Sequence, residues 1–235
     1  MPNFKKEYFV KHNLKYIKSK KTPMTNTNVY QENNHVTLIY DLLFCDNIGL
    51  YETHIKQPGI YPWNILFSEK SSEKELYEII NDVKAETRTK ILAYKKLNEQ
   101  NIKPAKKELL AVIVEIGLED GLDVLASYKD GTARFINHTG KMIFWEATDK
   151  TSDTLTAELF QNSENIVKQI GPWENPRRPA PVNGMLRISF LVSDGLYFGE
   201  GPIDTLFSDP FANPSLTSAT NLLKYLTDKA LEKNN

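Results

Sequence analysis

The chain has 235 residues, of which 40% are hydrophobic and 25% are charged, with a formal net charge of −1. This composition is ordinary for a globular protein of one large or two small domains, and the near-zero charge argues against a dedicated nucleic-acid binder. The sequence contains no apolar run long enough to span a bilayer and no apolar N-terminal segment typical of a secretory signal. We therefore expect a soluble protein of the cytoplasm, with a core large enough to need neither disulfides nor metal.

The near-neutral net charge hides a basic N-terminal segment. Residues 1–21 carry seven lysines and one glutamate, which leaves a charge of about −7 on the rest of the chain. These lysines are Lys5, Lys6, Lys11, Lys15, Lys18, Lys20 and Lys21. Aromatic and aliphatic side chains lie between them, so residues 1–34 are interpreted as a polar basic arm that docks on its own acidic domain. Contact of the arm with an anionic surface is the alternative.

Residues 35–104 are predicted to be mainly helical. Apolar residues between Val36 and Tyr51 recur at helical spacing, although the β-branched start of this segment leaves a short strand open as an alternative. The stretch 57–63 is rich in proline and contains glycine, so it predicts a loop.

A single long helix is predicted from Ser71 to Gln100. Ser72 and Glu75 have the spacing of a capping box, in which the two residues exchange hydrogen bonds at the start of a helix. An apolar stripe that includes Val83 follows at helical spacing.

Residues 109–145 predict an antiparallel meander, around which the rest of the chain is organised. The segment 109–116 is almost continuously apolar and rich in β-branched residues, which is typical of a strand covered on both faces. Asp120-Gly121 and Asp130-Gly131 each predict a tight turn, because glycine accepts the positive φ that such turns require. The strands are expected at 109–116, 122–128, 132–137 and 142–145, with a third turn at 138–141.

After the meander, the sequence predicts a helix, a loop and a hairpin. Apolar spacing predicts the helix over 151–170, and four prolines then exclude 171–184 from a sheet interior. Strands over 185–192 and 196–198 are expected to pair, and the glycine- and proline-rich stretch 199–202 is expected to end the hairpin.

The last helix is predicted to begin with Asn213 as its N-cap and Pro214 at its first helical position. The resulting fold class is α+β, with an antiparallel sheet of about six strands (meander plus hairpin) packed with three helices and preceded by a small mixed N-terminal region. We expect the arm 1–34, a helical region 35–104 and an α+β domain 105–235, with the last two packed as one unit.

The order of elements over roughly residues 71–232 is similar to that of the profilin-like and roadblock-like families. In those families a central sheet is flanked by helices, and many members are scaffolds or adaptors. The resemblance therefore implies a protein that binds other proteins. The strand counts on either side of the middle helix differ from those families, and no site residue is carried over from them.

Several side chains support an alternative function, a small hydrolase that uses carboxylates or His138 in a cleft at the strand ends. Glu115 and Glu146 lie on predicted apolar strands, and Asp194 and Glu200 lie near a turn. Two facing carboxylates can act as an acid/base pair. The competing interpretation is a surface histidine and carboxylates that face solvent or pair with basic residues, so no residue is assigned as catalytic or as a metal ligand.

Cys45 is the only cysteine, which excludes an intramolecular disulfide and a cysteine-rich zinc site. His54 lies nine residues further on and would make a Cys-His nucleophile pair possible. The apolar residues before Cys45 favour a small buried core residue instead.

Two tryptophans provide the candidate binding residues. Trp63 and Trp173 each follow a proline at the edge of a predicted core element, and Arg177 and Arg178 follow the second. Tryptophan and arginine are enriched at binding hot spots, although the same residues also seal a core under a loop. We expect a non-enzymatic protein-binding module, of scaffold, adaptor or regulatory type, that contacts a protein partner through these four residues and uses no cofactor.

Overall fold

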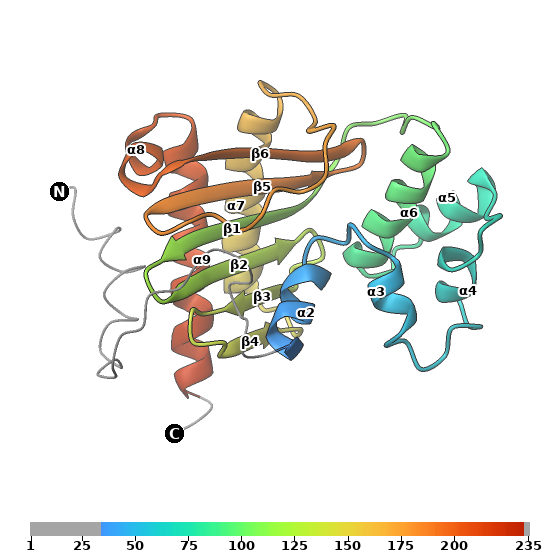
Figure 1. The fold of residues 1–235 in the computed structure, drawn as a ribbon, viewed down its shortest axis with the longest axis horizontal. Helices are drawn as coiled ribbons and strands as arrows, with labels where there is room; N and C mark the ends of the chain where they lie inside the picture. The colour runs from blue at the N-terminus through green and yellow to red at the C-terminus, as the bar shows by residue number, and fades with distance from the viewer. Residues whose placement is uncertain (1–33, 233–235) are drawn as a thin grey trace.

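The computed structural model of the chain describes residues 34–232 (Figure 1). The predicted basic arm, with all of its lysines, lies outside the described residues except for its last position. The described helices are α2 (Asn34–Leu42), α3 (Gly49–Glu52), α4 (Trp63–Leu66), α5 (Glu73–Asn81), α6 (Thr87–Glu99), α7 (Lys150–Val167), α8 (Ile203–Ser208) and α9 (Ala212–Glu232). No helix between residues 34 and 232 combines the length and the apolar character needed to cross a membrane.

A six-stranded antiparallel sheet forms the centre of the described structure, in the order β4-β3-β2-β1-β5-β6. The strands are β1 (Leu109–Leu118), β2 (Gly121–Tyr128), β3 (Ala133–Ile136), β4 (Met142–Trp145), β5 (Met185–Val192) and β6 (Gly195–Pro202). The meander supplies β1 to β4, and the hairpin of β5 and β6 joins it along β1. The α+β fold predicted from the sequence is therefore confirmed.

Strand β1 is covered on both faces, as its continuous apolar run predicted. Ala111 and Ile113 belong to a core shared with α2 to α6, whereas Val112 and Val114 belong to a second core shared with α7 and α9. Figure 1 shows α7 and α9 behind the sheet, α2 in front of it, and α3 to α6 grouped beside it. The sheet thus separates two hydrophobic cores.

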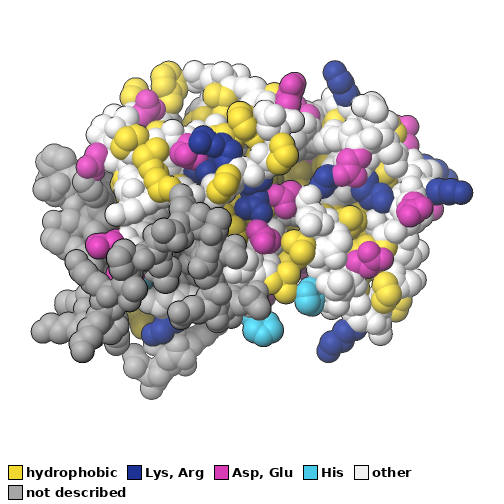
Figure 2. Space-filling model, viewed as in Figure 1, with side chains coloured by type: hydrophobic (Ala, Val, Ile, Leu, Met, Phe, Trp, Pro, Cys, Tyr) yellow, Lys and Arg dark blue, Asp and Glu magenta, His cyan; other side chains and the backbone are white. Residues whose placement is uncertain are grey.

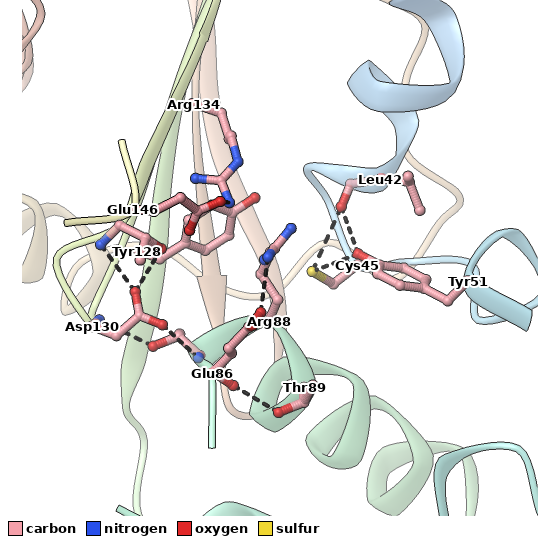
Figure 3. A network of polar contacts seen from close by, with 12 residues as sticks. Leu42, Cys45, Tyr51, Glu86, Arg88, Thr89, Tyr128, Asp130, Arg134 and Glu146 are labelled. Carbon is pink, nitrogen blue, oxygen red and sulfur yellow. Dashed lines mark hydrogen bonds and ion pairs between the residues drawn. The ribbon is translucent and has the colours of Figure 1, made fainter. Parts of the chain in front are cut away.

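The two Asp-Gly turns of the meander are confirmed. Gly121 and Gly131 both have positive φ, 146° and 85°, which an L side chain rarely adopts. Asp130 also links the sheet to the helices, because its Oδ2 accepts a hydrogen bond from the Thr87 N–H at 2.7 Å, at the start of α6 (Figure 3). The Thr87 hydroxyl in turn accepts from the Asp130 N–H at 3.1 Å. A turn residue of the meander thereby caps a helix of the other layer.

The single helix predicted over 71–100 is wrong: the structure has two helices, α5 and α6, separated by residues 82–86. Asp82 takes an extended backbone conformation, and its side chain accepts a hydrogen bond from the Lys84 N–H at 2.8 Å. This local side-chain bond competes with the helical backbone bonds and ends α5. Val83, which the stripe placed in the core, is 92% exposed.

One predicted helix cap is confirmed and one is wrong. The Ser72 side chain accepts from the Glu75 N–H, and the Glu75 carboxylate accepts from the Ser72 N–H, as a capping box requires. At the last helix, Asp209 replaces Asn213 as the capping side chain, because its Oδ1 accepts from the Ala212 N–H at 2.8 Å. Helix α9 consequently begins at Ala212, before the predicted position.

The predicted end of the hairpin is also wrong. Strand β6 continues to Pro202, and Gly199 and Gly201 pair with Ile188 and Leu186 of β5. Glycine and proline are tolerated here because β6 is the outermost strand of the sheet. The short helix α8 follows directly and was not predicted.

Candidate protein-binding groove

A proline-rich loop, residues 171–184, joins α7 to β5 and crosses the sheet face that α2 also covers (Figure 1). At its start, the Trp173 N–H donates to the Leu196 carbonyl oxygen at 2.7 Å. Near its end, a Cβ placed on Gly117 would lie only 2.1 Å from the Val182 carbonyl oxygen. The close approach of the loop to β1 therefore requires glycine at position 117.

Arg177 fixes the middle of this loop to the last turn of α2 and to the segment that follows it. Its Nε donates to Asp46 Oδ2 and its Nη2 donates to Asp41 Oδ1, both at 2.7 Å. Its guanidinium lies over the Phe44 ring, 4.0 Å from the centroid. Arg177 was selected from the sequence as a partner contact, but the structure places it in an intramolecular clamp, which we call the Arg177 clamp.

Two of the other three predicted contact residues, Arg178 and Trp63, take no part in the clamp. Arg178 is half-exposed on its side chain and lies 3.6 Å from a Glu200 carboxylate oxygen. Trp63 is partly buried and stacks between Tyr51 and Phe67, with ring centroids 5.8 Å and 5.4 Å away. Trp63 therefore fills the core among α3 and α4, and the structure does not bring it together with Trp173.

Trp173 is 37% exposed and is held in one orientation. Its indole Nε1 donates to the Pro176 carbonyl oxygen at 3.0 Å. Its ring meets the Phe198 ring edge to face, with centroids 5.1 Å apart. The backbone bond to β6, the indole bond and the ring contact together leave one part of the indole open at the surface.

That open part lines a groove of about 420 Å³, which we call the Trp173 groove. Helix α6 contributes Tyr94 and Ile91, the hairpin contributes Leu196, and the segment after α2 contributes Phe44. The volume lies within the range of roughly 300–1,000 Å³ that ligand sites occupy, and the wall is largely apolar and aromatic, as such sites usually are. The groove joins elements far apart in the sequence, so no local pattern predicted it.

The rim of the groove is acidic. It carries four carboxylates and one lysine, namely Asp46, Glu99, Glu174, Asp194 and Lys95. Lys95 is paired with Glu99 on α6, and Asp46 with Arg177 of the clamp. Asp194 accepts a hydrogen bond from the Tyr197 hydroxyl at 2.9 Å, and Glu174 forms no ion pair or hydrogen bond with another residue of the described part. Two carboxylates, Glu174 and Asp194, thus have no basic partner within residues 34–232.

Cys45 also lines the groove, but its thiol is turned into the core. Figure 3 shows it between Leu42 and Tyr51, and the Tyr51 hydroxyl lies 3.2 Å from its Sγ. Burial raises the pKa of Cys45 to about 12. A thiol that stays protonated at neutral pH is a poor nucleophile. The geometry therefore favours the core interpretation of Cys45 over the Cys-His pair.

The residues named for a hydrolase are not gathered in one cleft. His138, in the turn between β3 and β4, lies 3.0 Å from Asp123, and this hydrogen bond raises the His138 pKa. Glu146, beyond the other end of β4, pairs with Arg134 (Figure 3). Asp194 lies on the hairpin at the opposite edge of the sheet. The groups considered for acid/base catalysis are therefore distributed along both edges of the sheet.

Glu115 and Glu200 belong to a buried charge row that sequence reasoning did not find. In register across β1, β5 and β6, Glu115 faces Arg187 and Arg187 faces Glu200. The Arg187 Nε donates to Glu200 at 2.6 Å, and the Tyr40 hydroxyl of α2 donates to Glu115 at 2.7 Å. The sequence did not reveal this row, because Glu200 was expected to lie beyond the end of the hairpin and only the pairing of β1 with β5 brings Glu115 to Arg187.

No group of three or more histidine, cysteine, aspartate or glutamate side chains suited to holding a metal ion occurs within residues 34–232. No protein-family model matches the chain, and no curated protein or solved structure matches it. The similarity of element order to the profilin-like and roadblock-like families therefore stays a resemblance, and any inference about function depends on the geometry of the Trp173 groove.

Proposed function

We propose that this chain is a non-enzymatic protein-binding module and that the Trp173 groove is its contact surface. The observation that carries the proposal is a partly exposed tryptophan, held by three contacts at the wall of an aromatic groove. Tryptophan in a shaped apolar site is the residue type most enriched at binding hot spots. Trp173 and the half-exposed Arg178 remain the proposed contact residues, whereas Arg177 positions the loop that carries them.

Rigidity strengthens this proposal. A partner loses less conformational entropy when the surface that it meets is already fixed. The Arg177 clamp holds the loop to Asp46, and the Trp173 backbone bond holds it to Leu196, and both of these partners line the groove. The groove is therefore expected to be preformed and not assembled by the partner.

The test compares the full chain with Trp173→Ala, with Phe211→Ala as the matched control. Phe211 is 57% exposed and lies among residues of α7 and α9, none of which lines the groove. Each protein is used for affinity purification from the native cell, and every recovered protein is then tested for direct binding with purified components. We expect a partner whose affinity falls at least tenfold with W173A and is unchanged with F211A. Equal affinity for both variants would remove the groove as the contact surface.

The hydrolase alternative depends on a cleft that gathers His138, Glu146 and Asp194 or Glu200. Their distribution along both edges of the sheet gives it no specific support. The non-enzymatic proposal is therefore the one that the geometry of the described residues favours.

A further inference from the structure

We propose that the occupant of the Trp173 groove is an extended peptide segment of a partner protein that carries lysine or arginine side chains. This inference rests on the proposed function and specifies the chemistry of the partner. The geometry points to a basic side chain whose cation lies against the Trp173 and Tyr94 rings and beside the Glu174 and Asp194 carboxylates.

The charge of the groove favours a positively charged ligand. Its rim carries four carboxylates against one lysine, and that lysine is already paired with Glu99. Glu174 and Asp194 have no basic partner among residues 34–232, so a cation that approached them would not have to displace an existing ion pair. An acidic ligand would be repelled by these carboxylates. Such repulsion lowers affinity and allows a protein to reject wrong partners.

The aromatic wall of the groove also favours a positively charged ligand. Tryptophan and tyrosine rings attract a cation placed over their faces, and tryptophan does so most strongly. The chain already uses this contact beside the groove, where the Arg177 guanidinium lies 4.0 Å from the centroid of Phe44. Lysine and arginine side chains also have aliphatic stems that pack on apolar walls such as Ile91 and Leu196.

The position of the groove at a sheet edge favours an extended peptide over a small amine. The hairpin that lines it includes β6, the outermost strand. Within residues 34–232, the only backbone bond that β6 makes outside its pairing with β5 is the one that Leu196 accepts from Trp173. Edge strands offer unpaired backbone groups to an added strand. A peptide can use these groups while its basic side chains enter the groove.

The described side chains on the face shown in Figure 2 give no comparable support for an anionic ligand. On the face shown in Figure 2, acidic and basic side chains intermingle over the described part, without a broad basic patch. A nucleic acid or an anionic membrane requires such a patch. An anionic ligand is therefore not the proposal, and the glutamate peptide of the experiment tests for one.

The experiment titrates the isotope-labelled full chain with three short capped peptides and follows the indole N–H signals by NMR. The Trp173 signal is assigned by its loss in W173F. The peptides have the same glycine-serine frame and carry lysine, norleucine or glutamate at alternate positions. We expect saturable movement of the Trp173 signal with the lysine peptide, weaker movement with the norleucine peptide and none with the glutamate peptide.

Paired variants test whether the named carboxylates recognise the cation. Glu174→Gln with Asp194→Asn should weaken binding of the lysine peptide about tenfold, as expected for the loss of two partly exposed charge contacts. The control, Glu158→Gln with Glu164→Gln, removes the same charge from the exposed side of α7 and should leave the affinity unchanged. Melting curves of both pairs confirm that the variants are folded.

Several outcomes would overturn the proposal. Equal binding of the lysine and norleucine peptides would show that the groove selects apolar side chains and not cations. Equal weakening by both variant pairs would show attraction by net charge alone. If no peptide moved the Trp173 signal while W173A still lost a native partner, the protein-binding function would stand and the basic-peptide inference would fail.

Discussion

Glu115 and Arg187 face each other across β1 and β5 in the interior of the protein, with side chains 0% and 3% exposed. Arg187 Nη1 lies 3.6 Å from Glu115 Oε2, an oxygen that makes no hydrogen bond within the described residues. Arg187 instead directs its hydrogen bonds to Glu200 and to the backbone carbonyls of Arg178 and Pro179 in the proline-rich loop. The pair thus ties three strands to the loop that bears Trp173, while one carboxylate oxygen remains incompletely paired.

This incomplete pairing predicts an unusual pH dependence for Glu115. Burial raises the Glu115 pKa, and the attraction of Arg187 and the Tyr40 hydrogen bond offset only part of that effect. A carboxyl group whose pKa is higher in the folded than in the unfolded state destabilises the folded protein as pH rises. The loss begins at the unfolded-state pKa and is complete above the folded-state pKa. Glu115→Gln should therefore gain free energy of unfolding relative to the natural protein as pH rises above about 4.

Urea unfolding at several pH values measures the difference, with Glu158→Gln on the exposed side of α7 as the baseline. If the free energy of unfolding of the natural protein instead rose relative to that of E115Q as pH increased, the attraction of Arg187 would outweigh burial and the Glu115 pKa would be lowered.

The Arg177 clamp predicts different effects for two adjacent arginines. Arg177→Ala removes both ion pairs and the contact with Phe44, so it should lower the free energy of unfolding by about 1–3 kcal/mol. The loss stays moderate because Asp41 and Asp46 are partly exposed and water can solvate them again. Arg178→Ala removes one exposed pair and should change it by less than about 1 kcal/mol. Denaturant unfolding distinguishes the two, and similar losses would refute the clamp.

This difference between Arg177 and Arg178 affects how binding data on their variants are interpreted. Loss of a partner with R177A would report movement of the loop as well as any direct contact. W173A and R178A are therefore the cleaner variants for mapping the contact surface, because Trp173 and Arg178 expose more of their side chains.

Much of the fold follows from local sequence patterns, whereas the groove depends on contacts between residues far apart in the sequence. The meander was predictable because Asp-Gly turns and strand alternation act over a few residues, and Gly121 and Gly131 adopt the required positive φ. The break at Asp82 was missed because one side-chain bond to the Lys84 N–H overrides a continuous helical stripe. Trp173 could be selected by its type and setting, since it follows a proline in a loop.

The role of Arg177 was not accessible from sequence. Its partner Asp46 lies 131 positions away, and nothing local to either residue indicates the contact. Glu115 is similar: its place on an apolar strand was visible, but its facing residue depends on β5 joining the meander along β1. Long-range strand pairing, and not composition, therefore decides which charges become buried partners.

Asp130 predicts an acid-sensitive link between the sheet and α6. Burial alone would raise the pKa of Asp130, but hydrogen bonds from Thr87 and Thr132 outweigh it and lower the pKa. A carboxylate with a lowered folded pKa contributes stability above its unfolded pKa, and this contribution is lost as pH falls. Asp130→Ala should cost about 1–2 kcal/mol at neutral pH, as for loss of a helix cap, and less below about pH 4.

The check for Asp130 is urea unfolding of D130A at neutral and acidic pH, with Asp153→Ala in the exposed first turn of α7 for comparison. A cost for D130A that stays constant with pH would contradict the role of the ionised carboxylate at α6.

The close approach of the loop to β1 gives the last prediction. Gly117→Ala should lower the free energy of unfolding by about 1–3 kcal/mol, because the new methyl group would overlap the Val182 backbone and the loop would have to move. The same movement should shift the Trp173 indole NMR signal and weaken partner binding. Gly59→Ala is the matched control, since its Cβ would meet no atom within 4 Å, and its stability should change by less than about 0.5 kcal/mol. If G117A and G59A were equally stable, with an unchanged Trp173 signal, contact with β1 would not position the loop that forms the groove.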